Sequence, residues 1–271
     1  MRVSNMKRED DQGAPASADS DAEATNRAYY GRLSTGRDDY WRKMAAPRFR
    51  VETFLRLIAD EPTGSLVDLG CGNGLLLGEI RARHEGIELA GVDLSQAQIE
   101  ANRSRDPGVD WHAMDLDRSF GLPADLKDRF DAVVASEIIE HVREPRTFLE
   151  NALRMARPGR GRLLLSTQSG RLRETERRVG HLQHFTAEAM KGLLREAGWE
   201  PVRVWNAGFP FHDLSKWYAN RDPDATMRRF GEQSYGLRED LVCWALRAAF
   251  RLNSNRRGAQ LFAMARRPAS H

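Results

Sequence analysis

The sequence predicts an α/β protein in which a mostly parallel sheet is covered by helices on both faces. From residue 65 onward, short runs rich in Val, Leu and Ile alternate with longer runs of helical periodicity. A glycine-rich turn, Gly70-Cys71-Gly72-Asn73-Gly74, lies directly between the first short run and the first long one. The chain has 271 residues, 41% of them hydrophobic and 30% charged, which is enough apolar material for one or two cores.

The alternation sets the expected order of strands and helices. Strands are expected at 66–69, 88–92, 109–113, 130–135 and 162–166, with helices at 75–83, 96–103 and 145–156 between them. A polar, arginine-rich loop follows, and Thr186 then caps a helix that ends at Gly198. Two more strands are expected at 201–206 and 260–265.

Composition shifts divide the chain into five expected parts. Residues 1–25 contain almost no large apolar side chain and are expected to form a disordered tail, and residues 26–62 form an N-terminal helical cap. Residues 63–206 make the core and 207–257 a helical insertion that serves as a lid or acceptor site. Residues 258–271 hold the last strand and the C-terminus. Aromatic residues around the sixth strand and the start of the insertion are expected either to wall an acceptor pocket or to pack in the core: Trp205, Phe209, Phe211, Trp217 and Tyr218.

Charge, hydropathy and cysteine usage exclude several classes. The formal net charge of +3 comes from scattered arginines, so a nucleic-acid partner is disfavoured. The chain has no apolar run long enough to cross a bilayer, no apolar segment typical of a secretory signal, and two distant cysteines. We expect a cytoplasmic protein without membrane association, present as a monomer or homodimer.

The glycine turn and the residues after the next strands indicate an adenosyl ligand. Asp93 ends the strand at 88–92, where a carboxylate can accept both hydroxyls of a ribose, and Asp115 follows the next strand. The spacing is GxGxG and not GxGxxG, which disfavours a dinucleotide and therefore an NAD-dependent oxidoreductase. The turn also lacks the Lys-Ser/Thr ending of a phosphate-binding loop.

Four motifs in order, VDLGCGNG, GVDLS, AMDLD and FDAVVASEIIEHV, resemble the successive motifs of class I S-adenosylmethionine-dependent methyltransferases. The match runs from about residue 65 to 197, and SEIIEHV is similar to the ubiquinone-biosynthesis O-methyltransferase branch and its natural-product relatives. The resemblance implies a Rossmann-like sheet of seven strands, the last of them antiparallel, with the helical insertion between strands six and seven. It also implies S-adenosyl-L-methionine as the cofactor.

The resemblance also implies roles for single residues in cofactor binding. The three glycines of the turn would pack against the methionine portion, with Asp68 close to its ammonium group. Asp93 would bind the ribose, and Asp115 would recognise the adenine amino group. The other residues assigned to the cofactor flank these positions: Cys71, Asn73, Leu94, Met114, Leu116, Ser136 and Glu137.

Histidines are the candidates for the chemistry, because methylation of a hydroxyl requires a positioned acceptor and removal of its proton. The candidate catalytic residues are His141, His184 and His181. If residues 137–141 are helical, Glu137 shares a face with Glu140 and with His141, and with the distal His184 these side chains could hold a divalent metal. This pattern resembles the metal site of small-RNA 2′-O-methyltransferases. A base or substrate-orienting role, and a purely structural role, remain open for the same residues.

The favoured function is therefore transfer of a methyl group from S-adenosyl-L-methionine to a small-molecule acceptor. A hydroxyl is the expected target, in secondary metabolism or quinone-like biosynthesis. The alternative is a metal-dependent RNA 2′-O-methyltransferase, which the arginines between Arg171 and Arg178 would serve. A cofactor-binding protein without catalytic activity also fits the motifs.

Overall fold

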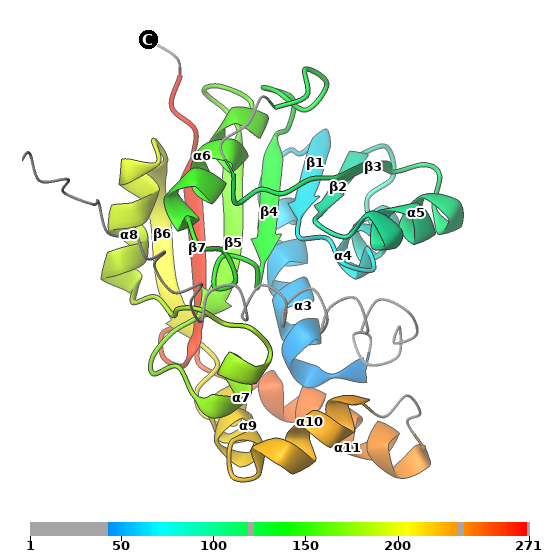
Figure 1. The fold of residues 1–271 in the computed structure, drawn as a ribbon, viewed down its shortest axis with the longest axis vertical. Coiled ribbons are helices and arrows are strands. Elements are labelled where there is room, and N and C mark those ends of the chain that lie inside the picture. The colour runs from blue at the N-terminus through cyan, green and yellow to red at the C-terminus, as the bar shows by residue number, and fades with distance from the viewer. Residues whose placement is uncertain (1–42, 119–121, 232–235, 270–271) are drawn as a thin grey trace, which may run out of the picture.

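A computed structural model places residues 43–118, 122–231 and 236–269, and its centre is one seven-stranded sheet (Figure 1). The strands lie in the order β3-β2-β1-β4-β5-β7-β6. β1 to β5 run parallel, and β7 is antiparallel to both β5 and β6. This confirms the predicted fold. The strands are β1 Ser65–Leu69, β2 Glu88–Asp93, β3 Asp110–Ala113, β4 Ala132–Ser136, β5 Arg162–Gln168, β6 Glu200–Ala207 and β7 Gln260–Arg266.

Helices cover both faces of the sheet because successive strand residues point to opposite faces. On one face, α6 and α8 bury side chains such as Phe148 and Met190 against Val67 and Leu69 of the first core cluster. On the other face, α3, α4, α5 and α11 pack around Leu66 in the second cluster. The helices are α3 Ala45–Ala59, α4 Leu75–Arg81, α5 Gln96–Arg105, α6 Pro145–Met155, α7 Glu174–Arg178, α8 Ala187–Glu196, α9 Phe211–Ala219, α10 Pro223–Gly231 and α11 Leu237–Phe250.

Local sequence signals fix several helix starts. The Thr186 hydroxyl accepts a hydrogen bond from the Ala189 amide at 3.1 Å, which confirms its expected role as the N-cap of α8. Ser95 caps α5 in the same way, through the amide of Gln98 at 3.3 Å. These caps place the loops that precede α5 and α8 at the carboxyl edge of the sheet, where a ligand would bind.

The expected helical insertion is confirmed as α9, α10 and α11, which connect β6 to β7 (Figure 1). α11 packs against α3, where the rings of Phe49 and Phe250 meet edge to face at 6.1 Å. Trp217 and Tyr218 of α9, which were expected to wall an acceptor pocket or to pack in the core, are instead exposed. No helix in the described ranges is both long and apolar enough to span a membrane.

Two segments differ from the sequence-based expectation. The arginine-rich stretch after β5 is not wholly a loop, because it contains α7, whose first turn is closed by the Arg173 amide donating to the Glu176 carboxylate at 2.6 Å. The segment from residue 137 to 144 is a turn and not a helix. The expected tail at 1–25 and the first part of the helical cap lie outside the described residues.

Candidate functional site

A cavity of about 980 Å³ lies at the carboxyl edge of the sheet. Its lining includes residues that follow β1, β2, β3 and β4 directly, such as Cys71, Leu94, Met114 and Glu137. It continues to residues of α3, α7, α9 and α10. The volume is at the upper end of the range for ligand sites, roughly 300–1,000 Å³. One cavity can therefore hold a cofactor and a small acceptor side by side.

The glycine-rich turn leaves its backbone open to this cavity. Gly70 and Gly72 adopt φ of +70° and +50°, a region that residues with a Cβ rarely enter. A Cβ added at Gly72 would meet nothing within 4 Å, because this side of the turn is bare. The amides of Gly70 and Cys71 both donate to the carbonyl of Val92, at 2.8 and 3.0 Å, so the turn is held against the end of β2.

Two buried carboxyl groups stand beside this turn. Asp93 accepts from the Gly72 amide and from the Ser95 amide, both at 2.9 Å, yet a carboxylate keeps further acceptor positions for ribose hydroxyls. Burial raises the pKa of Asp93 in spite of these amide donors. Burial, reinforced by the charge of Asp93, raises the pKa of Asp68 to about 8. A cationic ligand group beside Asp68 would favour its ionised form.

The residues after β3 line a further part of the same cavity. Met114, Asp115 and Leu116 all line the cavity. Asp115 is fixed by the amide of Asp117 at 3.1 Å and by the Arg118 guanidinium at 3.0 Å. The exposed side chain of Leu94 also lines this end, so apolar and acidic groups lie together, as an adenine ring requires.

Glu137 directly follows β4 with a φ of +53°, which is uncommon for a residue with a side chain. Its carboxylate accepts hydrogen bonds from Gln260 at 2.8 Å, from Ser166 at 3.1 Å and from Gln168. Arg50 lies 3.9 Å away. Burial raises the pKa of Glu137, but Arg50 and the three donors outweigh that effect, so its pKa is lowered. Glu137 is therefore an anion held towards β5 and β7, and it does not share a helical face with His141.

Glu140 is turned into the protein interior. It is fully buried, and one carboxylate oxygen accepts from the Thr167 hydroxyl at 2.7 Å. The other oxygen has no hydrogen-bond partner in the part of the chain that the structure describes. Burial, and then the charge of Glu137, raise the pKa of Glu140 well above its usual range. Burial therefore favours the protonated form of this carboxyl group when no cation is bound.

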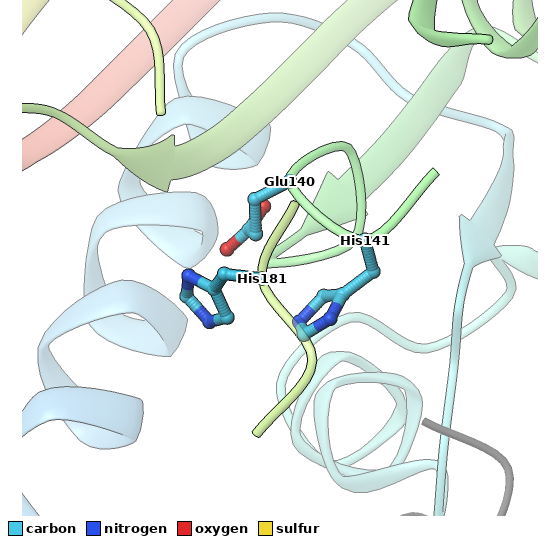
Figure 2. A group of neighbouring side chains, drawn as sticks. All are labelled: Glu140, His141 and His181. Carbon is cyan, nitrogen blue, oxygen red and sulfur yellow. The ribbon is translucent and has the colours of Figure 1, made fainter. Parts of the chain in front are cut away.

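The side chains of Glu140, His141 and His181 come together (Figure 2), and the two histidines line the cavity. One potential ligand atom from each residue lies within 4.8 Å of the others. The two imidazole rings meet edge to face, with 4.6 Å between their centroids. This group differs from the expected metal set, because Glu137 points elsewhere. His184, which was also expected in the metal set, is not a member of the group. It lies next to His181, with 3.1 Å between His184 Nε2 and His181 Nδ1.

The imidazoles of this cluster are neutral at pH 7. Burial lowers the pKa of His141 to about 4 and that of His181 to about 2. Burial also lowers the pKa of His184, which contacts the Gly170 carbonyl at 3.3 Å. His141 and His181 line the cavity, whereas His184 is not among the lining residues. Neutral imidazoles can accept a proton or hydrogen bond, and they are the form that binds a metal.

The wall of the cavity formed by α7 and α9 contains polar residues that sequence analysis missed. Lys216 on α9 pairs with Glu176 on α7 at 3.0 Å and donates to the Gln168 side chain at 2.7 Å. His212 lies one turn before Lys216 and is 2% exposed, and its burial lowers its pKa. The i,i+4 spacing of His212 and Lys216 was a weak available signal, but nothing local linked it to Glu176.

None of the five aromatic residues expected either to wall an acceptor pocket or to pack in the core lines this cavity. Trp205 stacks on Phe262 at 5.4 Å and packs with the core, as does Phe211. Phe209 is exposed, like Trp217 and Tyr218 of α9. The residues of α7, α9 and α10 that line the cavity are mostly polar, so this part of the cavity suits a molecule with hydrogen-bonding groups.

Comparison with known proteins adds a family to this geometry. The model of a methyltransferase-domain family matches residues 40–204. The bifunctional methionine biosynthesis protein MetXA/MetW of Rhodopirellula baltica is 38% identical over 114 residues, 39% of this chain and 17% of that protein. The ubiquinone biosynthesis O-methyltransferase of Coxiella burnetii is 32% identical over 106 residues, 38% of this chain and 42% of that protein. The chain thus aligns with less than half the length of either relative.

A solved structure shows the same fold over nearly the whole chain. The 1,6-didemethyltoxoflavin-N1-methyltransferase of Burkholderia thailandensis, with 1,6-didemethyltoxoflavin and S-adenosylhomocysteine bound, superposes with a TM-score of 0.56. The match covers 95% of this chain and 93% of that one at 18% identity. At this level of identity the likeness supports the architecture alone.

Proposed function

This chain belongs to the methyltransferase-domain family of class I S-adenosylmethionine-dependent enzymes, and we propose that it methylates a hydroxyl group of a small molecule. The observation that carries the proposal is the single cavity described above. One end has the bare glycine turn and the carboxyl groups of Asp68 and Asp93, and the other has His141 and His181. Cofactor and acceptor would therefore meet within one cavity.

The residues of the cofactor half fit S-adenosylmethionine group by group. Asp68 suits the ammonium of the methionine portion, and Arg50 of α3, which lines the same cavity, suits its carboxylate. Asp93 would hold the ribose, while Asp115 and its apolar neighbours would hold the adenine. The cofactor, when bound, supplies an electrophilic methyl group on a sulfonium.

The acceptor half would orient the hydroxyl. His141 and His181 are neutral, so either can accept a hydrogen bond from it and fix its lone pair towards the methyl group. Their lowered pKa values make them weak bases, which assigns them mainly to positioning and to receiving the proton late in the transfer. Lys216 and Glu176 would hold polar groups elsewhere on the acceptor. The walls formed by α7, α9 and α10 favour a small acceptor.

The second candidate is a metal-dependent RNA 2′-O-methyltransferase. The specific observation that favours it is the group of Glu140, His141 and His181, with the unpaired and buried Glu140 oxygen beside two neutral imidazoles. One carboxylate and two imidazoles are ligands that borderline divalent ions accept, and a bound cation would ionise Glu140. Such an ion would lower the pKa of a hydroxyl that it contacts.

The experiment is transfer of labelled methyl from S-adenosylmethionine into a cell extract separated into small molecules and RNA, with and without EDTA. Label in an organic fraction that resists EDTA is expected, and it supplies the acceptor for identification. Label in RNA that EDTA abolishes would replace this proposal with the second candidate. The absence of transfer to either fraction, with cofactor binding intact, would leave the chain as a cofactor-binding protein.

A further inference from the structure

α11 carries apolar side chains on two opposite faces. Cys243 and Phe250 are buried in the packing of α11 against the rest of the protein. Leu237, Leu241 and Trp244 are 90%, 66% and 68% exposed. Because these three are spaced by four and three residues, they form one stripe along the helix. A surface helix normally exposes its polar face, so an apolar stripe of this size indicates an interaction surface.

A second cavity, of about 480 Å³, lies between α3 and α11, and five of its twelve lining residues are arginines. Its cationic residues are Arg48, Arg56, Arg83, Arg247 and Arg251, and its one acidic residue is Glu52. Glu79 pairs with both Arg48 and Arg83, which still leaves five cations against two anions. This cavity shares no lining residue with the one assigned to methyl transfer.

The arginines of this cavity have spare hydrogen-bond donors. The side chain of Arg48 is 11% exposed, and its Nε is buried without a partner in the described ranges. Arg247 and Arg251 make no side-chain hydrogen bond or ion pair to any residue that the structure describes. From residue 241 to 271 the sequence contains six arginines and no acidic residue. Planar guanidinium groups with free donors match the oxygens of a phosphate group.

We propose that this arginine-lined cavity binds the phosphate of an anionic phospholipid and that the apolar stripe of α11 lies against the lipid surface. Arg247 follows Trp244 by three residues on α11 and therefore borders the stripe, and Arg251 comes directly after the helix ends at Phe250. An apolar stripe with tryptophan, bordered by arginines, is the pattern of helices that lie in a membrane interface. The inference replaces the sequence-based expectation of a protein without membrane association, and it does not depend on the proposed methyl transfer.

Charge favours a lipid surface over a second copy of the chain. A twofold contact through the stripe would bring the same surface of both copies together, and therefore the arginines of one copy near those of the other. Like charges at an interface oppose association, whereas anionic head groups would neutralise them. The structure thus assigns the stripe and its arginines to one ligand.

Co-sedimentation of the full chain with vesicles tests the proposal. Vesicles of phosphatidylglycerol with phosphatidylcholine should bind the chain, vesicles of phosphatidylcholine alone should bind it weakly, and salt should weaken the binding. The double variant Arg247→Gln/Arg251→Gln should bind at least about tenfold more weakly. The control Lys191→Gln/Arg195→Gln on α8 removes two cations far along the chain and should bind as the wild type does.

A second pair of variants tests the stripe. Leu241→Ser should weaken vesicle binding about tenfold, because it removes most of one aliphatic side chain that would lie in the lipid. Val202→Ser, which removes a half-exposed aliphatic side chain from β6, should leave it unchanged. Thermal melting of every variant verifies folding, and methyl transfer to a soluble acceptor should persist in all of them.

Four results would overturn the proposal. The first is a wild-type chain that ignores anionic vesicles, and the second is equal binding by the arginine variant and its control. The third is stabilisation by inorganic phosphate through Arg247 and Arg251 without vesicle binding, which would assign the cavity to a soluble phosphate compound. A mass in light scattering that falls when Trp244→Ser is introduced, again without vesicle binding, would assign the stripe to a second copy.

Discussion

The two ends of the main cavity are built in different ways. The end that we assign to the cofactor consists of backbone amides and short acidic side chains, placed at or just after the carboxyl ends of strands of the sheet. The acceptor end consists of longer side chains on separate helices and turns, held by pairs such as Lys216 with Glu176. The cofactor end therefore has one fixed shape set by the sheet, whereas the acceptor end can change with single side chains while the fold stays the same.

The largest effect is expected at the cofactor end, from Asp93→Ala. This change removes the ribose acceptor and also the carboxylate that anchors the amides of Gly72 and Ser95. Loss of two or more charge-assisted hydrogen bonds should weaken cofactor binding by at least about 100-fold, measured by titration calorimetry. Asp110→Asn, at the start of β3 and outside the cavity lining, is the control and should bind normally. Near-normal binding by Asp93→Ala would remove Asp93 from the site.

Much of the cofactor end could be predicted because its residues follow strands. Parallel strands bring their carboxyl ends to one edge of a sheet, so the positions of Asp68, Asp93 and Asp115 along the sequence already place them together. Arg50 was missed, although it lies on the same cavity, because it comes from a helix that precedes the sheet and carries no motif.

The acceptor end could not be predicted in the same way. Gln168 and Lys216 meet across 48 positions, and no local pattern sets where α9 lies relative to β5. The turn after β4 has a positive φ at Glu137, which sequence periodicity does not reveal. As a result, helical spacing joined Glu137 to His141, whereas the folded turn instead brings Glu140 and His181 to that imidazole.

At the acceptor end, His181→Ala should lower kcat by about 100-fold while the cofactor dissociation constant stays within about threefold, as loss of a positioning or proton-accepting group does. Stopped assays at saturating cofactor, with calorimetry for binding, measure the two quantities separately. Equal losses in binding and turnover would show that His181 supports the fold of the whole cavity. His184→Ala should likewise spare cofactor binding, because His184 contacts only the acceptor side.

Glu140→Gln distinguishes the metal-free and metal-dependent reactions at the same cluster. Without a metal, burial favours the protonated, neutral form of Glu140, so glutamine, which is also neutral, should change kcat by less than about threefold. With a metal, the change removes the one anionic ligand and should abolish turnover together with EDTA-sensitive activity. Metal content by mass spectrometry verifies which case applies.

The pH dependence of cofactor binding depends on Asp68. Its pKa of about 8 means that the free protein holds a proton there at pH 6 and loses it as the pH rises to 8. Because a cationic ammonium favours the ionised carboxylate, binding releases that proton, and affinity should rise by up to about tenfold from pH 6 to 7. Calorimetry in two buffers of different ionisation enthalpy measures the proton release. Asp68→Asn should abolish the release, and an unchanged release would place the titrating group elsewhere.

An effect smaller than that at Asp68 is expected from the Lys216 and Glu176 pair, because it sets the fit of the acceptor and not the chemistry. Removing only Lys216 would leave Glu176 buried without its cation and could weaken the fold, so the informative change is Lys216→Met with Glu176→Gln. This double variant should raise the KM for the acceptor by about fivefold, with kcat and cofactor binding nearly unchanged, since it removes binding shared by ground and transition states. Lys191→Met, on α8 outside the cavity, is the matched control. A fall in kcat at constant KM would instead give the pair a role in aligning the reacting groups, and the two ends of the cavity would then be coupled through Gln168, which bonds both Lys216 and Glu137.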